Sequence, residues 1–335
     1  MIKAIKCGVT NFEDLHEVFK ISSEELENRK AKLFPTGAPD KEGATTSIFL
    51  ASLSAVKEFR QYLLSNIGAN KINGKTSKLH VYTELPSEDL KTRPDGLVVI
   101  TSGLRTPVIE WAAFIESKVG HKQIEQTQID RYIDFAKDKG VENIITISNQ
   151  LVPTPFDSPV TTKKKIKLFH WSWAYIKVMA LYLVRNEMVE DEDHVYLLSE
   201  FRRYMDCHKN ISHYTDMGEH WKEAAENIHV HDKSKKLSSN TVEKAVTSYS
   251  QEEKDLGLCL TDKSNYLIEL VTKKDRYEEI SDMIHADRCV TSTFMIDSNK
   301  KILLTLLLIL KEEPSLAFIK LKYPKEKPED KQQNC

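Results

Sequence analysis

The stretch RPDGLVVITSGLRTPVIEWAAFIESKVG, residues 93–120, decides the fold. It contains two apolar runs of strand length and composition, separated by a loop that holds glycine and proline. Asp95 opens the first run, and Glu116 and Lys118 close the second. Side chains two apart on a strand point to the same face. We therefore expect Asp95, Glu116 and Lys118 to converge at one strand end.

The segments on either side of this stretch extend it to an α/β pattern. Apolar residues recur at roughly helical spacing over residues 45–65 and predict a helix there. A strand is expected around Val81. A helix is expected over about residues 122–139, followed by Gly140 as a C-terminal stop signal. The β-rich residues 141–149 follow. The predicted order is αβββαβ, and the predicted fold class is α/β.

The rest of the chain predicts further helix and strand. A basic connector precedes an apolar helix that begins at Trp171, and the acidic residues 189–194 suggest a domain boundary. Residues 291–310 predict a β-hairpin that turns at Asp297-Ser298-Asn299. The predicted division is a domain over residues 1–188, an accessory α+β region for substrate binding or oligomerisation over 189–323, and a polar tail over 324–335.

Composition restricts the class of protein. The formal net charge of the 335 residues is -2, so nucleic-acid binding requires local basic patches or metal ions. The five cysteines lie far apart without a CxxC pair, which argues against a disulfide framework and a zinc ribbon. The chain shows no signal-peptide pattern and no apolar run long enough to span a bilayer. We expect a cytoplasmic protein without a membrane partner.

The three converging residues suit phosphodiester hydrolysis. Two carboxylates, Asp95 and Glu116, form an oxygen-rich site of the kind that Mg²⁺ prefers. Hydrolysis also needs an oriented water molecule and positive charge near the developing phosphate charge, which Lys118 and a metal ion can supply. The alternative interpretation is that these are solvated charges at strand ends.

Pro94-Asp95 followed by Glu116-Ser117-Lys118 in an αβββαβ order resembles the PD-(D/E)XK nuclease superfamily. The resemblance covers about residues 42–149. It implies a restriction-endonuclease-like core with a mixed central sheet and a Mg²⁺-dependent deoxyribonuclease, for which Mn²⁺ is an alternative cofactor. It also implies that Asp95 and Glu116 bind the metal, whereas Lys118 orients or activates the attacking water.

A second element lies on the predicted helix after the lysine strand. Gln128 and Tyr132 resemble the Q-x-x-x-Y motif of RecB-like exonucleases. Residues four apart share one helix face. The resemblance implies that Gln128 hydrogen-bonds a substrate phosphate or a metal-bound water and that Tyr132 braces the scissile strand. The alternative is a surface glutamine and a tyrosine that packs the helix.

Other charged residues are candidates for supporting roles. Many members of the superfamily carry an extra acidic ligand ahead of the first core helix, and Glu42 occupies that place; its alternative role is to complement the helix dipole. Arg93 is a candidate for neutralising phosphate, with a solvated loop arginine as the alternative. The basic residues Lys163, Lys164 and Lys165 either contact DNA phosphates or belong to a solvated linker.

The function expected from these features is a DNA nuclease acting in restriction, repair or defence against mobile DNA. The alternative is a noncatalytic nucleic-acid-binding or assembly module that retains the same fold. Nucleases of this type often pair subunits to cut both strands, so a homodimer is a hypothesis that sedimentation would test. The sequence contains neither a G-x-G-x-x-G nor a P-loop motif, which argues against a nucleotide-dependent enzyme.

Overall fold

The computed structural model forms two compact units, residues 1–214 and residues 215–335. The residues that it describes are 4–8, 12–34, 38, 41–85, 92–211, 221–223, 226–227, 237–272, 275–287, 289–296, 302–309 and 318–322. Within this part of the chain, no helix is long and apolar enough to cross a membrane. The polar tail over 324–335 lies outside the described residues.

The first unit is built on a five-stranded sheet in the order β1-β2-β3-β4-β5. The strands are β1 (Lys78–Thr83), β2 (Gly96–Ser102), β3 (Val108–Ser117), β4 (Asn143–Ser148) and β5 (Lys167–Ser172). The first three strands pair antiparallel, whereas β3, β4 and β5 pair parallel. The predicted α/β class is therefore confirmed, and the sheet is mixed. Strand β5 was not predicted, because the lysine-rich residues 163–167 that lead into it resemble a linker and its buried end, HWS, resembles the start of the helix that follows.

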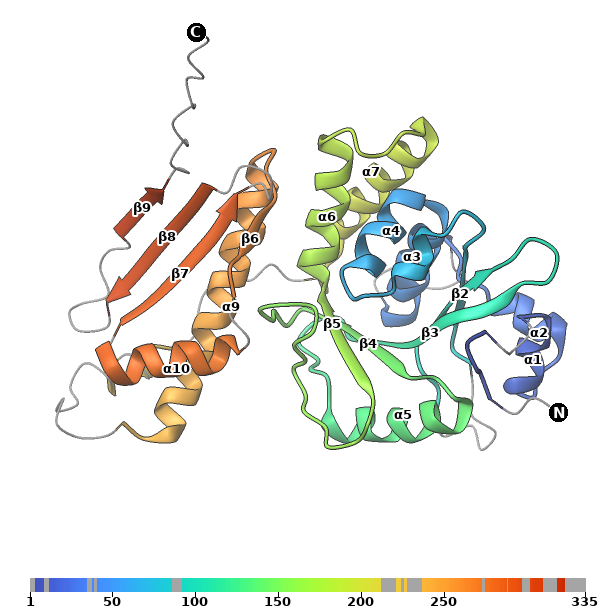
Figure 1. The fold of residues 1–335 in the computed structure, drawn as a ribbon, viewed down its shortest axis with the longest axis horizontal. Coiled ribbons are helices and arrows are strands. Elements are labelled where there is room, and N and C mark those ends of the chain that lie inside the picture. The colour runs from blue at the N-terminus through green and yellow to red at the C-terminus, as the bar shows by residue number, and fades with distance from the viewer. Residues whose placement is uncertain are drawn as a thin grey trace, which may run out of the picture. The chain divides into compact units, whose positions relative to one another are not determined.

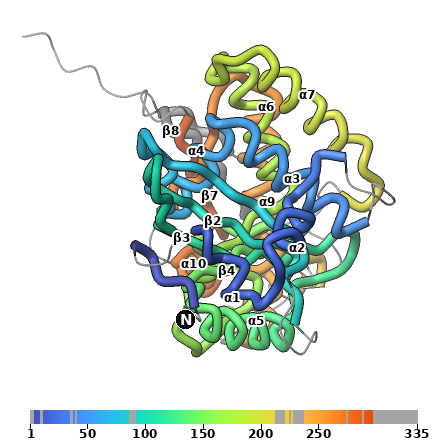
Figure 2. Tube along the Cα trace, turned by 90° about the vertical axis from the view of Figure 1, so that its right-hand side faces the viewer, coloured from blue at the N-terminus to red at the C-terminus, as the bar shows by residue number. Residues whose placement is uncertain are grey.

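Helices cover both faces of this sheet (Figures 1 and 2). They are α1 (Leu15–Val18), α2 (Ser23–Asn28), α3 (Glu42–Ala55), α4 (Lys57–Ser65), α5 (Gln126–Lys139), α6 (Trp173–Arg185) and α7 (Glu192–Cys207), with 3-10 turns at Phe12–Asp14 and Asn70–Asn73. Helices α3, α4, α6 and α7 lie on one side of the sheet, and α5 lies on the other. As predicted, α5 ends at Lys139, where Gly140 takes a left-handed backbone with φ 71°.

Aromatic side chains fill both sides of the sheet. On the side of α3, the Phe49 ring meets Trp171 and Trp173 edge to face, at centroid distances of 6.2 and 5.9 Å. On the side of α5, the rings of Phe114 and Phe135 stack at 5.2 Å. Both tryptophans are at most 1 % exposed. The sheet that carries the charged strand ends is therefore rigidly supported on both faces.

The prediction of one continuous helix over residues 45–65 is wrong, because two helices, α3 and α4, meet at Val56. This residue has extended backbone angles, φ −92° and ψ 113°, and ends α3 while it begins α4. Just before the break, the Ser52 hydroxyl donates to the Ile48 carbonyl at 2.8 Å, a side-chain bond that tends to bend helices. The break directs the buried Val56 and Phe59 side chains inward, where Phe59 meets the ring of Phe49.

The division between the units falls later than the boundary predicted after residue 188. Helix α7 makes extensive contacts with α6 and with α3. Its buried side chains include Leu198 and Phe201, and the Phe201 ring lies 6.3 Å from the ring of Phe49. Helix α7 therefore completes the core of the first unit. The acidic residues just before it are an exposed helix start within the unit.

The second unit contains helices and an antiparallel sheet in the order β6-β7-β8-β9. Its elements are α9 (Ser239–Lys263), β6 (Ile268–Leu270), α10 (Arg276–Asp287), β7 (Cys289–Ile296), β8 (Ile302–Ile309) and β9 (Phe318–Lys322). The predicted hairpin strands are confirmed by the pairing of Ile296 with Ile302 and of Cys289 with Ile309. The predicted turn at Asp297-Ser298-Asn299 lies outside the described residues.

Candidate active site

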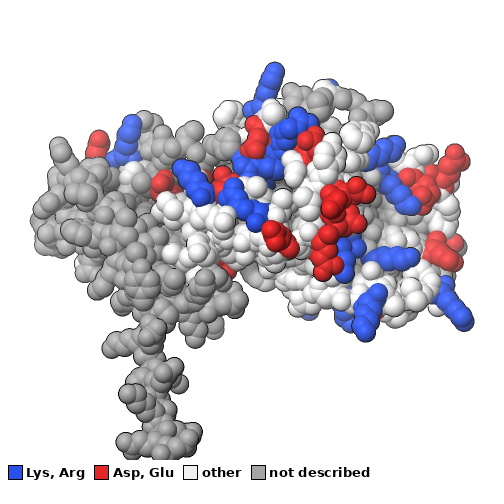
Figure 3. Space-filling model, turned by 90° about the horizontal axis from the view of Figure 1, so that it is seen from above, with Lys and Arg blue, Asp and Glu red and all other residues white. Residues whose placement is uncertain are grey.

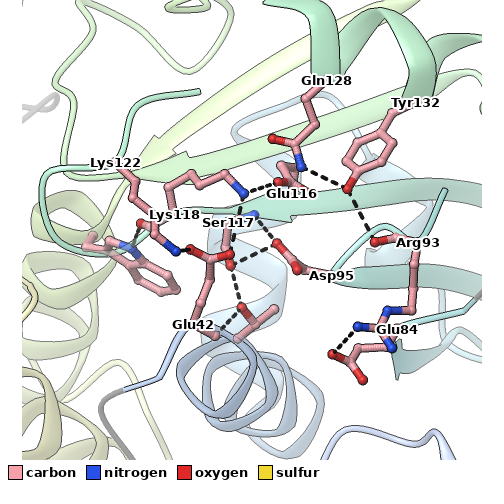
Figure 4. A network of polar contacts seen from close by, with 12 residues as sticks. Glu42, Glu84, Arg93, Asp95, Glu116, Ser117, Lys118, Lys122, Gln128 and Tyr132 are labelled. Carbon is pink, nitrogen blue, oxygen red and sulfur yellow. Dashed lines mark hydrogen bonds and ion pairs between the residues drawn. The ribbon is translucent and has the colours of Figure 1, made fainter. Parts of the chain in front are cut away.

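The pairing of β2 with β3 brings the predicted acidic residues together. Gly96 is opposite Ile115, so Asp95 and Glu116 are neighbours at the ends of adjacent strands. The Ser117 amide donates to Asp95 Oδ2 at 2.7 Å, and the Ser117 hydroxyl donates to the same oxygen at 3.3 Å. Figure 4 shows these groups facing one another beside the first turn of α3. The predicted convergence is therefore present in the structure.

Lys118 lies between two carboxylates. Its Nζ donates a short hydrogen bond to Glu116 Oε1 and lies 3.4 Å from Glu42 Oε1 (Figure 4). The Lys118 main chain is fixed at both ends of the residue, because its amide donates to the Ile147 carbonyl of β4 and its carbonyl accepts from Trp173 Nε1, each at 2.8 Å. The position of the lysine is thus set by β4 and by the start of α6.

Burial shapes the protonation of these groups. Burial raises the pKa of the Asp95 carboxyl to about 6, although the Ser117 amide and Lys118 oppose the shift. Burial and the charge of Asp95 raise the pKa of Glu116 to about 8, against the attraction of Lys118. Burial lowers the pKa of Lys118, but Glu116, Glu42 and Asp95 outweigh this effect and hold it above its ordinary value. Lys118 therefore stays protonated. The raised pKa values of Asp95 and Glu116 indicate that this ammonium group does not offset the effect of their burial.

The oxygen atoms present fit a hard divalent cation in their chemistry. Oε2 of Glu116 is buried without a hydrogen bond and Glu116 is only 1 % exposed, whereas Oε2 of Glu42 lies 3.5 Å from the Lys122 ammonium (Figure 4). Carboxylate oxygens are the preferred ligands of Mg²⁺ and Mn²⁺. In the described ranges, no three His, Cys, Asp or Glu side chains already form a group arranged to hold a metal ion. At this site the Lys118 ammonium contacts both Glu116 and Glu42.

The two residues of the Q-x-x-x-Y motif bond to each other and to the strand that carries Asp95. Gln128 Nε2 donates to the Tyr132 hydroxyl at 3.1 Å, and that hydroxyl donates to the Arg93 carbonyl at 3.3 Å. Tyr132 is only 6 % exposed, and burial together with the Glu116 charge raises the pKa of its phenol. Tyr132 thus holds the backbone at Arg93, two residues before Asp95. The sequence alone did not reveal this contact.

Two further residues that the sequence did not single out complete the network. The Thr46 hydroxyl shares a hydrogen bond of 2.5 Å with the Ser117 hydroxyl, and both groups are fully buried. The Thr46 hydroxyl oxygen also lies 2.8 Å from the Glu42 carbonyl. Each hydroxyl carries one proton, so Ser117 donates to Asp95 when Thr46 donates to Ser117, and this arrangement links α3 to Asp95. Ser117 occupies the variable position of the motif, and Thr46 is one of several hydroxyl residues in α3. No spacing rule distinguishes them.

The residues predicted to contact phosphate lie at two different places in the structure. Arg93 Nη2 lies 3.5 Å from Glu84 Oε1, next to the site (Figure 4). Lys164 lies against α5, where its Nζ is 2.8 Å from both oxygens of Asp134. Lys163 and Lys165 are exposed. The structure therefore brings Arg93 to the site, whereas the Lys164 ammonium is held by a carboxylate of the adjacent helix.

Comparison with known proteins adds no family to this description. No family model matches the chain, and neither a curated protein nor a solved structure matches it.

Proposed function

We propose that the chain is a metal-dependent nuclease that hydrolyses phosphodiester bonds in DNA. The observation that carries the proposal is the meeting of Asp95, Glu116 and Lys118 at the ends of two adjacent strands, with Glu42 on the opposing helix. A buried glutamate, Glu116, beside a half-buried lysine and two half-buried carboxylates is costly to maintain. Such an arrangement is typical of catalytic sites, where pKa values are displaced by burial and by charged neighbours.

Asp95 and Glu116, with Glu42, are the residues that would hold the cation. Bound Mg²⁺ would act as a Lewis acid on the phosphate and lower the pKa of a coordinated water. The Ser117 amide and hydroxyl hold one oxygen of Asp95, which orients the carboxylate before any ligand binds. The chain therefore supplies a preorganised acidic centre.

Lys118 supplies the positive charge of the chain's own catalytic apparatus. Its raised pKa keeps it protonated at neutral pH, so it is suited to orient water and to stabilise negative charge that develops on the phosphate. Of the two roles that the sequence left open for Lys118, the proposal adopts the one in which the ammonium group orients the attacking water.

The test is cleavage of linear, circular and single-stranded DNA with Mg²⁺ or Mn²⁺ by the full chain. We expect metal-dependent cutting that falls by at least about 100-fold in Lys118→Ala and Asp95→Asn. Lys57→Ala, at the exposed start of α4, is the matched control and should cut like the wild type. Failure of the folded wild type to cut any of these substrates contradicts the proposal and favours a noncatalytic binding module.

A further inference from the structure

A basic cavity adjoins the catalytic cluster. It has a volume of about 360 Å³, within the range of small-ligand sites. The lining side chains that matter here are Lys30, Lys32, Lys41 and Glu84, together with Gly43 and Ala44 in the first turn of α3. Three lysines and one glutamate make this lining basic, although the whole chain has a net charge of -2.

Counter-charges leave positive charge available in the cavity. Lys30 Nζ pairs with Glu27 at 2.7 Å, and Glu84 pairs with Arg93. Among the residues that the structure describes, neither Lys32 nor Lys41 forms an ion pair. On the face shown in Figure 3, basic and acidic side chains are interspersed. The cavity is therefore a local concentration of positive charge.

The first turn of α3 adds hydrogen-bond donors to the same cavity. Lys41 is the N-cap residue, and its side chain makes no capping bond because an ammonium group cannot accept one. Gly43 and Ala44, which line the cavity, are the second and third residues of this 14-residue helix. Amides at these positions lack partners within the helix. Together with the lysines, they favour an anion.

The wall that carries the lysines is held in place before any ligand binds. The Ser47 hydroxyl of α3 accepts from the Lys32 amide at 2.7 Å and donates to the Lys32 carbonyl at 2.9 Å. The adjacent Ala31 amide donates to the Val81 carbonyl of β1 at 3.1 Å. The segment is thus fixed between α3 and β1, which reduces the entropy cost of ligand binding.

The cavity is connected to the catalytic carboxylates by main-chain contacts. The Glu84 amide donates to the Asp95 carbonyl at 3.2 Å. Glu84 has a left-handed backbone with φ 54°, an uncommon conformation for a residue with a side chain. Glu42 is the residue between Lys41 and Gly43 in the chain. A strand of nucleic acid that reaches the catalytic cluster would therefore pass beside this cavity.

We infer that the cavity binds a phosphate group of the substrate strand, close to the bond that is cut. The inference rests on the proposed nuclease function and extends it to how the strand is held. A phosphate can receive hydrogen bonds from the α3 amides while Lys32 and Lys41 neutralise its charge. The phosphate is either a terminal monoester or an internal diester, and both present the same oxygen atoms to the cavity.

The test measures binding and cleavage by Lys32→Ala/Lys41→Ala in the full chain, with Lys57→Ala as the control. Binding is followed by fluorescence anisotropy with a labelled single-stranded oligonucleotide in EDTA, over a series of salt concentrations. We expect the dissociation constant of the double variant to rise by about 10-fold and the salt slope to become shallower by about one. With metal, KM should rise about 10-fold, while kcat stays within about 3-fold of the wild type.

Two substrate comparisons locate the phosphate. A preference for a 5′-phosphorylated over a 5′-hydroxyl strand that disappears in the double variant supports a terminal phosphate. Equal effects of the variant on both strands and on circular single-stranded DNA support an internal phosphate. An unchanged dissociation constant and salt slope in the folded double variant overturns the inference, and circular dichroism with thermal unfolding checks the fold.

The binding measurement separates this inference from the proposed function. If the wild type does not cut but its DNA binding depends on Lys32 and Lys41, the cavity stands and the nuclease proposal fails. If the wild type cuts with metal and the double variant binds and cuts like Lys57→Ala, the nuclease proposal stands and the cavity fails.

Discussion

The Tyr132 hydroxyl donates a hydrogen bond to the Arg93 carbonyl, and this bond ties α5 to the segment that leads into Asp95. Gln128 completes the link by donating to the Tyr132 oxygen from one helical turn earlier. Gln128 and Tyr132 are therefore connected to Asp95 through the backbone at Arg93. Groups that orient a ligand from behind in this way affect metal affinity or activity by about 10- to 100-fold.

Tyr132→Phe is expected to weaken the response to metal. Loss of the hydroxyl leaves the Arg93 carbonyl without its donor from α5 and loosens Asp95, so the Mg²⁺ concentration for half-maximal cleavage should rise about 10-fold. Metal titrations of cleavage, compared with Gln128→Ala, measure this effect. If KM for DNA rises instead and the metal dependence is unchanged, Tyr132 braces the DNA strand and its positioning role is refuted.

Ser117→Ala tests the hydroxyl link from α3 to Asp95. The variant keeps the 2.7 Å amide bond to Asp95 and loses only the hydroxyl contacts to Asp95 and Thr46. We expect kcat to fall about 3- to 10-fold, which corresponds to about 1 kcal/mol for one hydrogen bond. Thr46→Val should lower kcat to a similar extent, and the double variant should show little further loss. Additive losses in cleavage rate would mean that Thr46 and Ser117 act independently.

Glu116→Gln tests whether Glu116 binds the metal ion, because a bound ion stabilises the folded chain. In the wild type, Mg²⁺ at about 100 times its dissociation constant should add about 2.7 kcal/mol to the free energy of unfolding. We expect Glu116→Gln to lose this increment, because the substituted amide replaces a buried carboxylate that has one oxygen without a partner. Thermal unfolding with Mg²⁺ and with EDTA measures the difference. An equal increase in the variant argues against Glu116 as a ligand.

The sequence predicted the centre of the site well because strand geometry determines it. Glu116 and Lys118 lie two residues apart at the end of an apolar strand, and Asp95 begins the preceding one. The alternation of side chains and the pairing of neighbouring strands then leave little freedom. Glu42, predicted as an extra acidic ligand ahead of the first core helix, lies 3.4 Å from Lys118, and its role as a metal ligand stays a prediction.

The remaining features depend on long-range packing. The break at Val56 lies inside a continuous apolar helical pattern, so periodicity alone cannot locate it. Strand β5 is stabilised by its parallel pairing with β4, and the lysine-rich residues that lead into it resemble a linker. The hydroxyl contacts of Thr46 depend on how close α3 comes to the sheet. Local sequence does not encode such distances.

His170 makes the stability of the first unit depend on pH. It is fully buried between Thr146 Oγ1 at 2.8 Å and the Gln150 carbonyl at 3.0 Å, and burial lowers its pKa to about 4. Below pH 6.5 the unfolded chain binds a proton that the folded chain excludes, so the free energy of unfolding falls as the pH decreases toward 4. The expected contribution is about 1.4 kcal/mol per pH unit.

His170→Gln should remove that contribution. The glutamine amide keeps a donor for the Gln150 carbonyl but does not titrate. Urea unfolding at pH 5 and pH 7 should show a smaller change in the free energy of unfolding between the two pH values in the variant. Burial also lowers the pKa of His80, so the contribution of His80 to the pH dependence of stability remains in both proteins. An unchanged difference between the two pH values would show that His170 does not control it.

Glu253 and Arg276 form the buried ion pair that we expect to control the stability of the second unit. Their side chains are 1 % and 4 % exposed, and two bonds of 2.6 and 2.9 Å join them side by side. Ser292 donates to Glu253 at 2.8 Å, and Arg276 donates to the Thr291 carbonyl at 2.7 Å. Glu253→Gln leaves Arg276 with only Glu279, whose Oε2 lies 2.9 Å from Nη1 and whose side chain is 29 % exposed. The loss should therefore cost less than the value of about 3–5 kcal/mol expected for a buried charge with no partner.

A double-mutant cycle identifies the part of this cost that belongs to the pair. Arg276→Met leaves the Glu253 carboxylate unpaired and should be similarly costly, whereas Glu253→Gln/Arg276→Met removes both charges. The double variant should therefore be more stable than the sum of the single effects predicts, by roughly 1–3 kcal/mol. Hydrogen exchange in α10 and β7 of the full chain reports the stability of this unit directly. Additive effects would mean that each charge is stabilised by other neighbours, and the polar bonds to Ser292 and Thr291 would then carry more of the stability than the ion pair.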